Sequence, residues 1–198
     1  ERMRTSFSYV GLTTGVSESF LKEIDNHKNV IYITGEAGTM EGAEGVALAV
    51  EAVLKTGGIG VKVETAGKAF EGAVWTDILF LPQEGKLYEL FVIDSITDEN
   101  GSVYSCGMQN LGYKDVMVSG EEFQEAVNLI RIFNFYQIVD KPNILSGQTF
   151  RIDADAPKFR IVAEQYQPKT MYFIIHLGCG ILRRRKVCFM GYTDFLKA

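Results

Sequence analysis

The sequence has few of the histidine and cysteine residues from which metal sites and disulfide frameworks are built. It contains two histidines, His27 and His176, and three cysteines in 198 residues. The two histidines are too far apart for any ordinary zinc-ligand spacing, and the cysteines are odd in number and form no C-x-x-C pair. We therefore expect no metal ion and no cofactor, and a reducing, cytoplasmic environment.

Long apolar runs and clustered positive charges are scarce as well. The longest nearly apolar run, residues 171–182, is interrupted by His176 and by glycine, and it is far shorter than the roughly 20 residues that cross a bilayer. The net charge is −5, and the basic residues cluster only at 183–186. Because phosphate contacts need clustered Lys and Arg, the sequence predicts neither a membrane nor a nucleic-acid partner.

The overall composition is that of an ordinary globular protein. Hydrophobic residues make up 46% of the chain and charged residues 23%, well away from the composition of disordered segments. At this length one hydrophobic core is the usual outcome. We expect a single α+β domain over residues 29–170, preceded by a weakly patterned segment, 1–28, and followed by a C-terminal tail, 171–198.

The clearest local pattern lies between residues 29 and 64. Residues 29–34 are β-branched and aromatic, and residues 59–64 alternate, so both segments predict strands. Between them Thr39 is placed to cap a helix, whose apolar positions 46, 50, 53 and 54 have helical spacing. This is a β-α-β unit, and its crossover should be right-handed if the two strands share a sheet.

A β-hairpin is predicted further along the chain. Residues 65–80 favour a second helix anchored by Trp75, and residues 82–85 should break it. The apolar runs 87–96 and 102–108 then flank a loop with the strong turn signal Asn-Gly. These two runs predict the paired strands of the hairpin.

The strongest helix signal begins at Ser119. Ser119 and Glu122 have the spacing of a capping box, and a broad apolar stripe follows until residues 140–143. Residues 148–152 and 159–166 favour two more strands. The predicted fold is thus a mixed β-sheet with a β-α-β unit, a β-hairpin and two or three packing helices.

A glycine-rich loop is the first candidate binding site. Gly35, Gly38 and Gly42 follow a strand and enter a helix, where free backbone amides can hold a phosphate. The loop lacks the Gly-Lys-Ser/Thr of a P-loop and the spacing of a dinucleotide fingerprint, and glutamates in and around it would repel an anion. Glycines used for a tight turn and close helix packing are the favoured alternative.

The segment Cys106-Gly107-Met108 is the second candidate, because it ends a predicted strand where a nucleophile could be exposed. A reactive thiolate needs a base or a positive environment, which the chain scarcely offers. We expect a buried, inert cysteine and no catalytic residue. The Asp-x-Asp at 153 and 155 resembles a cation ligand pair, but beside Pro157 it favours a turn.

A family resemblance rests mainly on residues 105–116, Ser-Cys-Gly-Met-Gln-Asn-Leu-Gly-Tyr-Lys-Asp-Val. With the loop and helix of 35–54 and the strand of 58–64, this segment resembles a bacterial family catalogued as domain of unknown function number 4261. There a strand ending in Thr/Ser-x-Gly-Met/Leu leads into Leu/Phe-Gly and an acidic residue. The resemblance covers about residues 30–170, and it implies a compact α+β domain and no established activity or ligand.

The C-terminal residues depart from that resemblance. Related members end in a segment like Asn-Pro-Phe-Gly-Met/Leu-Trp, whereas this chain has Ile-Ile-His-Leu-Gly-Cys-Gly-Ile at 174–181. A reading frame shifted by one base permits the family's segment. One hypothesis is that residues from about 173 onward are a frameshifted tail, and the other is a genuine, divergent strand. The nucleotide sequence decides between them.

Two functions remain open at this point. The first is a non-enzymatic protein-interaction domain of a bacterial cytoplasm, such as an immunity-type protein that neutralises or senses a protein partner. The alternative is a small-molecule or nucleotide-binding protein, or an enzyme, that uses the Gly35–Gly42 loop and the Cys106–Met108 turn. This second function gains support if both loops lie at one end of the sheet around a pocket.

Overall fold

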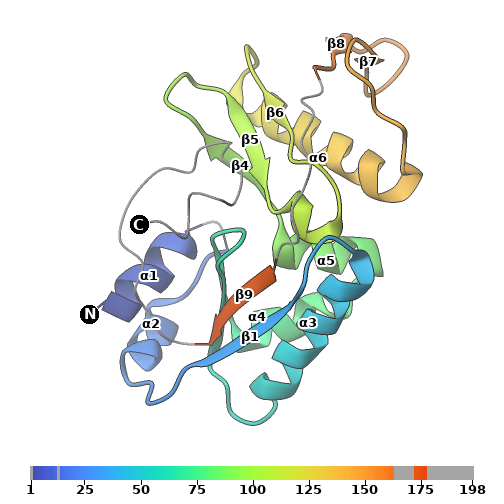
Figure 1. Ribbon diagram of the computed structural model, residues 1–198. Coiled ribbons are helices and arrows are strands. Elements are labelled where there is room, and N and C mark those ends of the chain that lie inside the picture. The colour runs from blue at the N-terminus through green and yellow to red at the C-terminus, as the bar shows by residue number, and fades with distance from the viewer. Residues whose placement is uncertain (1, 13, 163–171, 178–198) are drawn as a thin grey trace, which may run out of the picture.

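The computed structural model describes residues 2–12, 14–162 and 172–177 (Figure 1). These residues form an α+β fold with six α-helices, one short 3-10 helix and three small antiparallel sheets. None of the helices in the described ranges is long and apolar enough to cross a membrane.

The largest sheet has the strand order β1-β9-β2-β3, with β1 at Ile31–Glu36, β9 at Tyr172–Leu177, β2 at Gly60–Val63 and β3 at Lys68–Glu71. Strand β9 is antiparallel to both β1 and β2, so these two strands run in the same direction on either side of it. Helix α3, Met40–Leu54, connects them. The prediction of a mixed sheet is wrong, because β9 separates the two strands and every ladder among the described residues is antiparallel.

Helix α3 forms as its sequence predicts. The Thr39 hydroxyl caps it by accepting a hydrogen bond from the Gly42 amide at 3.0 Å. Its buried face carries Val46, Val50 and Leu54, which pack in the main core with the strands and with α5. The chain leaves the helix through Gly57, whose φ of 104° suits glycine.

Residues 65–91 differ from the prediction. Strand β3 replaces the first half of the expected helix, and only α4, Gly72–Ile78, is helical there. Pro82 begins α5, Gln83–Phe91, rather than ending a helix, because proline needs no hydrogen-bonded amide at a helix start. Residues 87–91 are therefore helical and not a strand, and Trp75 packs edge-on against Phe91.

The β-hairpin is confirmed, in a shorter form. Strand β4, Ile93–Thr97, pairs antiparallel with β5, Val103–Cys106, and β5 also pairs with β6, Met117–Val118. The register of β4 against β5 shifts between Ile93 and Ile96. This irregularity is a β-bulge, which re-aims the side chains of the bulged strand. The 3-10 helix η1, Met108–Leu111, follows β5.

Helix α6, Phe123–Asp140, covers the hairpin. It begins later than the predicted capping box, because the Glu122 carboxylate accepts from the Gln124 amide and the Ser119 hydroxyl is bonded to that of Ser102. Phe123, the first residue of the predicted apolar stripe, is 46% exposed. Beyond α6, β7 (Thr149–Phe150) and β8 (Phe159–Arg160) form a small two-stranded sheet around the predicted turn.

The N-terminal segment is more ordered than its sequence pattern indicates. It forms α1, Arg2–Val10, and α2, Glu18–Asp25, with Ser17 as the N-cap of α2. Phe7 and Phe20 meet edge-on at 5.6 Å between ring centroids and form a small core with Leu21, Ile24 and Ala69. These two helices therefore pack against the β3 end of the large sheet.

Candidate functional site

The two segments that the sequence proposes as binding loops lie against each other. The amide of Gly38 donates a hydrogen bond to the carbonyl of Asn110 in η1, at 3.1 Å. Gly112 packs against the same loop, because a Cβ added to Gly112 would lie 2.5 Å from the Gly38 carbonyl oxygen. A Cβ added to Gly35 would lie 2.5 Å from the Val46 side chain, and one added to Gly42 would lie 2.5 Å from the Glu36 carbonyl oxygen. The glycines thus permit close packing of the chain on itself.

The Cys106–Met108 turn is equally tightly packed. Gly107 has a φ of 116° and lies against the Phe91 carbonyl, and Met108 is fully buried. The Cys106 thiol donates to the Thr65 carbonyl at 3.6 Å. Burial, with a further contribution from Asp115, raises the pKa of this thiol to about 12. Cys106 is therefore protonated at neutral pH, and a neutral thiol is a poor nucleophile.

Asp115 organises this turn. Its carboxylate accepts hydrogen bonds from the Met108 amide at 3.1 Å, the Gly107 amide at 3.3 Å and the Ser105 hydroxyl at 3.0 Å. It therefore caps η1 from outside the helix. Burial raises the pKa of Asp115 to about 6, although these hydrogen bonds act in the opposite direction. The carboxylate thus has a structural role. Ligand binding by the six predicted residues stays a prediction; they are Gly35, Gly38, Gly42, Cys106, Gly107 and Met108.

A different group of side chains surrounds a cavity of about 130 Å³ where β3, α5, α6 and the start of β4 meet. We call it the Lys68 pocket, and it is lined by Lys68, Tyr88, Glu89, Val92, Ile93, Asp94, Ser95 and Arg131.

Lys68 is the unusual member of this pocket. The residue is only 6% exposed, and its amine donates hydrogen bonds to the carbonyls of Glu89 and of Val92, the latter at 2.8 Å. These carbonyls belong to the C-terminal end of α5, the negative end of the helix dipole. Burial lowers the pKa of Lys68 to about 8. An appreciable share of this amine is therefore neutral near physiological pH.

The opposite wall of the pocket is a charged and hydrogen-bonded cluster. The Arg131 guanidinium pairs with the Glu89 carboxylate, lies 3.8 Å from the Asp94 carboxylate and stands over the Tyr88 ring. The Tyr88 hydroxyl donates to Asp94 at 3.0 Å. Asp94 belongs to the bulged part of β4, so the bulge accounts for its position in the pocket. Burial raises the pKa of Tyr88, which keeps the hydroxyl protonated.

Buried amide side chains connect this cluster with the η1 region. The Asn134 amide donates to the Tyr88 hydroxyl at 3.1 Å. The Gln137 amide donates to Asn134 at 3.4 Å and to the Lys114 carbonyl at 3.0 Å. Both amides lie on the buried face of α6. A continuous chain of hydrogen bonds therefore runs from the residue before Asp115 to the Lys68 pocket.

Sequence reasoning missed this site for an identifiable reason. Lys68 lies inside the helix predicted over residues 65–80, and Asp94 lies inside the run 87–96 that was predicted as a strand. The available signal was Asn134 and Gln137 within the apolar stripe of the last long helix, because buried polar side chains require partners. That signal predicts a buried polar network, but it does not identify the lysine.

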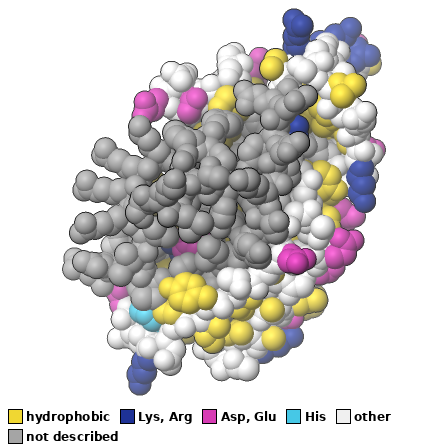
Figure 2. Space-filling model, viewed as in Figure 1, with side chains coloured by type: hydrophobic (Ala, Val, Ile, Leu, Met, Phe, Trp, Pro, Cys, Tyr) yellow, Lys and Arg dark blue, Asp and Glu magenta, His cyan; other side chains and the backbone are white. Residues whose placement is uncertain are grey.

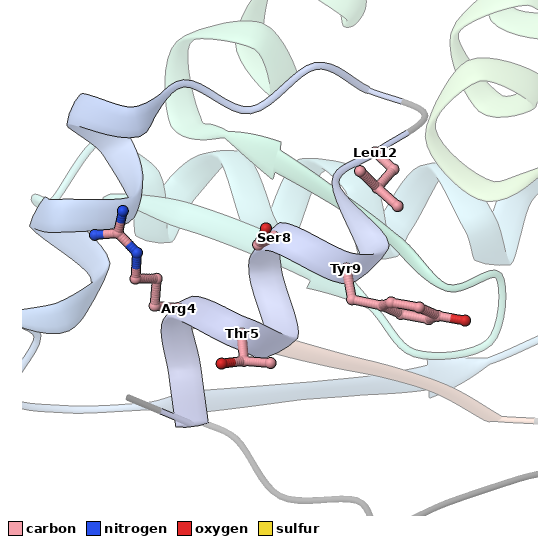
Figure 3. Close-up of a pocket in the computed structure, with 5 residues that line it drawn as sticks. All are labelled: Arg4, Thr5, Ser8, Tyr9 and Leu12. Atoms are coloured by element: carbon pink, nitrogen blue, oxygen red, sulfur yellow. The ribbon is translucent and has the colours of Figure 1, made fainter.

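A second, larger hollow of about 260 Å³ lies on the surface of α1 (Figure 3) and is lined by Arg4, Thr5, Ser8, Tyr9 and Leu12. Arg4 and Tyr9 point to opposite sides of the helix in this view. Arg4 is the only charged residue among these five, and its guanidinium already pairs with Glu18 and Asp25 of α2. Convergent polar groups are thus concentrated at the Lys68 pocket rather than here.

No group of three or more His, Cys, Asp or Glu side chains within the described ranges could hold a metal ion. Comparison of the chain with family models, with curated proteins and with solved structures gives no match. The resemblance to domain family 4261 therefore stays a prediction, and the function has to be argued from the site.

Proposed function

We propose that the protein binds a small polar molecule in the Lys68 pocket. The observation that supports this most directly is a buried lysine amine in the wall of a cavity that Arg131, Asp94 and Tyr88 also line. Binding sites typically combine concavity with a few converging polar groups, and ionisable groups with shifted pKa values concentrate there.

The size and charge of the pocket define the class of ligand. A volume of about 130 Å³ is smaller than the roughly 300–1,000 Å³ of pockets that hold drug-sized ligands, so the pocket suits a small molecule rather than a whole nucleotide. The pocket offers two basic side chains, Lys68 and Arg131, and two acidic ones, Glu89 and Asp94. A ligand of a few heavy atoms with oxygen acceptors would interact with the basic groups, and any donor group with the acidic ones.

The test is binding by wild-type protein and by two matched lysine variants. Small carboxylates, hydroxy acids and aldehydes are screened by thermal shift, since a ligand of the native state raises its stability. Lys68→Met should abolish the shift. Lys86→Met is the control, because Lys86 is also a poorly exposed lysine but pairs with Glu44 outside the pocket. An unshifted melting temperature for every compound, or an equal shift in the Lys68 variant, would contradict the proposal.

A protein partner is the second candidate, and exposed apolar side chains on β1 and α3 favour it. Hydrophobic side chains gather at the lower part of the face in Figure 2, where Figure 1 places β1 and α3. Ile31, Tyr32 and Leu48 are all about half exposed. Among the described strands, β1 also lies at the edge of its sheet, and an edge strand is a common surface for pairing with another chain.

This second function is an immunity-type or partner-sensing role in a bacterial cytoplasm. A pull-down from native lysate should recover a stoichiometric partner with the wild type. Ile31→Lys should lose it, whereas Val139→Lys, which replaces an exposed apolar residue on α6, should retain it. Recovery of no stoichiometric partner, or equal recovery by both variants, would count against this role.

A further inference from the structure

We propose that Lys68 is a reactive amine that forms a Schiff base with a small aldehyde or ketone bound in its pocket. The inference rests on the proposed small-molecule function and adds to it the chemical class of the ligand, a carbonyl compound.

The first argument is the hydrogen bonding of the amine. A neutral amine has two N–H donors and one lone pair, and Lys68 has two backbone acceptors, the carbonyls of Glu89 and Val92. Both donors are thus used, and the remaining tetrahedral position holds the lone pair of the neutral form. The Phe70 ring also lies near the amine, with its centroid at 5.5 Å. Because Lys68 lines the cavity, the lone-pair position is the one that the proposal assigns to the bound molecule.

The second argument is the contrast with the other poorly exposed lysines. Lys62 has the Glu64 carboxylate at 2.6 Å, and Lys86 has the Glu44 carboxylate at 2.5 Å. No carboxylate of the described residues lies within 4.0 Å of the Lys68 amine. The protein therefore buries this amine without the direct ion pair that would hold it protonated, and burial favours its neutral form.

The charged side chains that line the pocket without contacting the Lys68 amine favour a cationic adduct. With Lys68 neutral, the described residues that line the pocket include Arg131, Glu89 and Asp94, whose charges sum to one negative charge. An iminium ion restores a positive charge at this position, and its charge is more dispersed and less dependent on hydration than that of an ammonium. Carbamate formation with carbon dioxide would instead add a second negative charge. The electrostatics of the pocket thus select a carbonyl compound.

The reaction balances without any oxidant or reductant. The nitrogen lone pair attacks the carbonyl carbon and forms the C–N bond, and a proton moves from nitrogen to oxygen to give the carbinolamine. The C–O bond then breaks, and the second amine proton leaves with the oxygen as water, which leaves a C=N bond. Protonation of that nitrogen gives the iminium ion, whose N–H can donate to one of the two carbonyls. The Tyr88 hydroxyl, hydrogen-bonded to Asp94, also lines this pocket.

The experiment traps the adduct on the full chain. Wild-type protein is incubated with glycolaldehyde, or separately with pyruvate, and with sodium cyanoborohydride at pH 7.5, and the modified lysines are identified by peptide mass mapping. At least one probe should modify Lys68 at least tenfold faster than Lys62 and Lys86 in the same molecule. Lys68→Arg should lose the fast adduct, and Lys86→Arg should retain it. Lys68 reacting no faster than the other two lysines with either probe would overturn the inference.

This outcome is separable from failure of the proposed function. If thermal shifts by non-reactive carboxylates or hydroxy acids depend on Lys68 while no fast adduct forms, small-molecule binding stands and the Schiff base is refuted. Because the decisive rate comparison is made between lysines of the wild-type protein, it does not depend on the folding of any variant.

Discussion

The backbone amide of Gly38 is hydrogen-bonded to the carbonyl of Asn110, at 3.1 Å, and this bond joins the loop before α3 to the 3-10 helix after β5. These two segments are far apart in the sequence. They belong to the glycine-rich loop and to the region of the Cys106–Met108 turn, the two candidate binding sites that the sequence predicts. Asn110 is fully buried, and its side chain amide also donates to the Phe91 carbonyl at 3.2 Å. Asn110 thus connects η1 by hydrogen bonds both to the loop before α3 and to the end of α5.

Gly112→Ala tests how tightly this junction is packed. Gly112 has a φ of 90°, and an added Cβ would lie 2.5 Å from the Gly38 carbonyl oxygen. The variant should lose roughly 3 kcal/mol or more of unfolding free energy, because the backbone strain and the clash add. Gly120→Ala is the matched control, with a φ of 83° and open space around its Cβ, and it should lose about 1–2 kcal/mol. Urea denaturation measures both, and equal losses would refute the close contact.

Asp115→Asn tests the buried carboxylate by the pH dependence of stability. The pKa of Asp115 is raised from 3.8 to about 6, so the folded protein holds this proton more tightly than the unfolded chain. Its contribution to stability is present below pH 4 and is lost as the pH rises to 6. From pH 4 to pH 7 the stability difference should therefore move in favour of the variant by up to about 3 kcal/mol. A difference that stays constant, or moves the other way, would contradict the raised pKa.

Lys68→Met should show a pH dependence in a higher range. Burial lowers the pKa of Lys68 from 10.5 to about 8, so the unfolded chain binds this proton more tightly than the folded protein. The contribution of Lys68 to the unfolding free energy therefore rises between pH 8 and pH 10.5. Over that range the unfolding free energy of the wild type should increase by up to about 3 kcal/mol relative to that of the variant. Chemical denaturation at several pH values measures the gain. A parallel pH profile for the two proteins would show that the amine is not desolvated.

Cys106 should resist alkylation in the native state. Its thiol is protonated at pH 8, because burial raises its pKa to about 12, and alkylating reagents attack the thiolate. Iodoacetamide at pH 8 should modify Cys106 at least a hundredfold more slowly in native protein than in 8 M urea, as followed by peptide mass mapping. Comparable rates in the two conditions would indicate an exposed, reactive cysteine and would reopen its catalytic use.

The sequence predicted correctly those helices and strands that are determined by interactions between residues close together in the chain. The Thr39 cap, the apolar spacing of α3 and the turn loop before β5 all act within a few residues, and each element forms where its signal lies. The errors have local causes too. Gly67, with a φ of 61°, turns the chain between β2 and β3, and this turn was hidden within an expected helix. Pro82 was interpreted as a helix breaker, although it stands at the start of α5.

The Lys68 pocket could not be predicted in the same way. Its lysine comes from β3, its carbonyl acceptors from the end of α5, and its arginine from α6. No periodicity or spacing in the sequence records that these three elements meet. The burial of Lys68, and with it the shift of its pKa, is therefore a property of the tertiary structure alone.

The position of β9 in the large sheet has a consequence for folding during synthesis. Strands β1 and β2 each pair with β9, yet β9 is the last of the described strands to be made. Until residues 172–177 emerge, the nascent chain carries two strands that lack this partner and stand as open edges, which invite pairing with other chains. Closing the sheet then requires a contact across most of the sequence, which is slow to form. We therefore expect this step to limit the folding rate and to be the stage most exposed to aggregation.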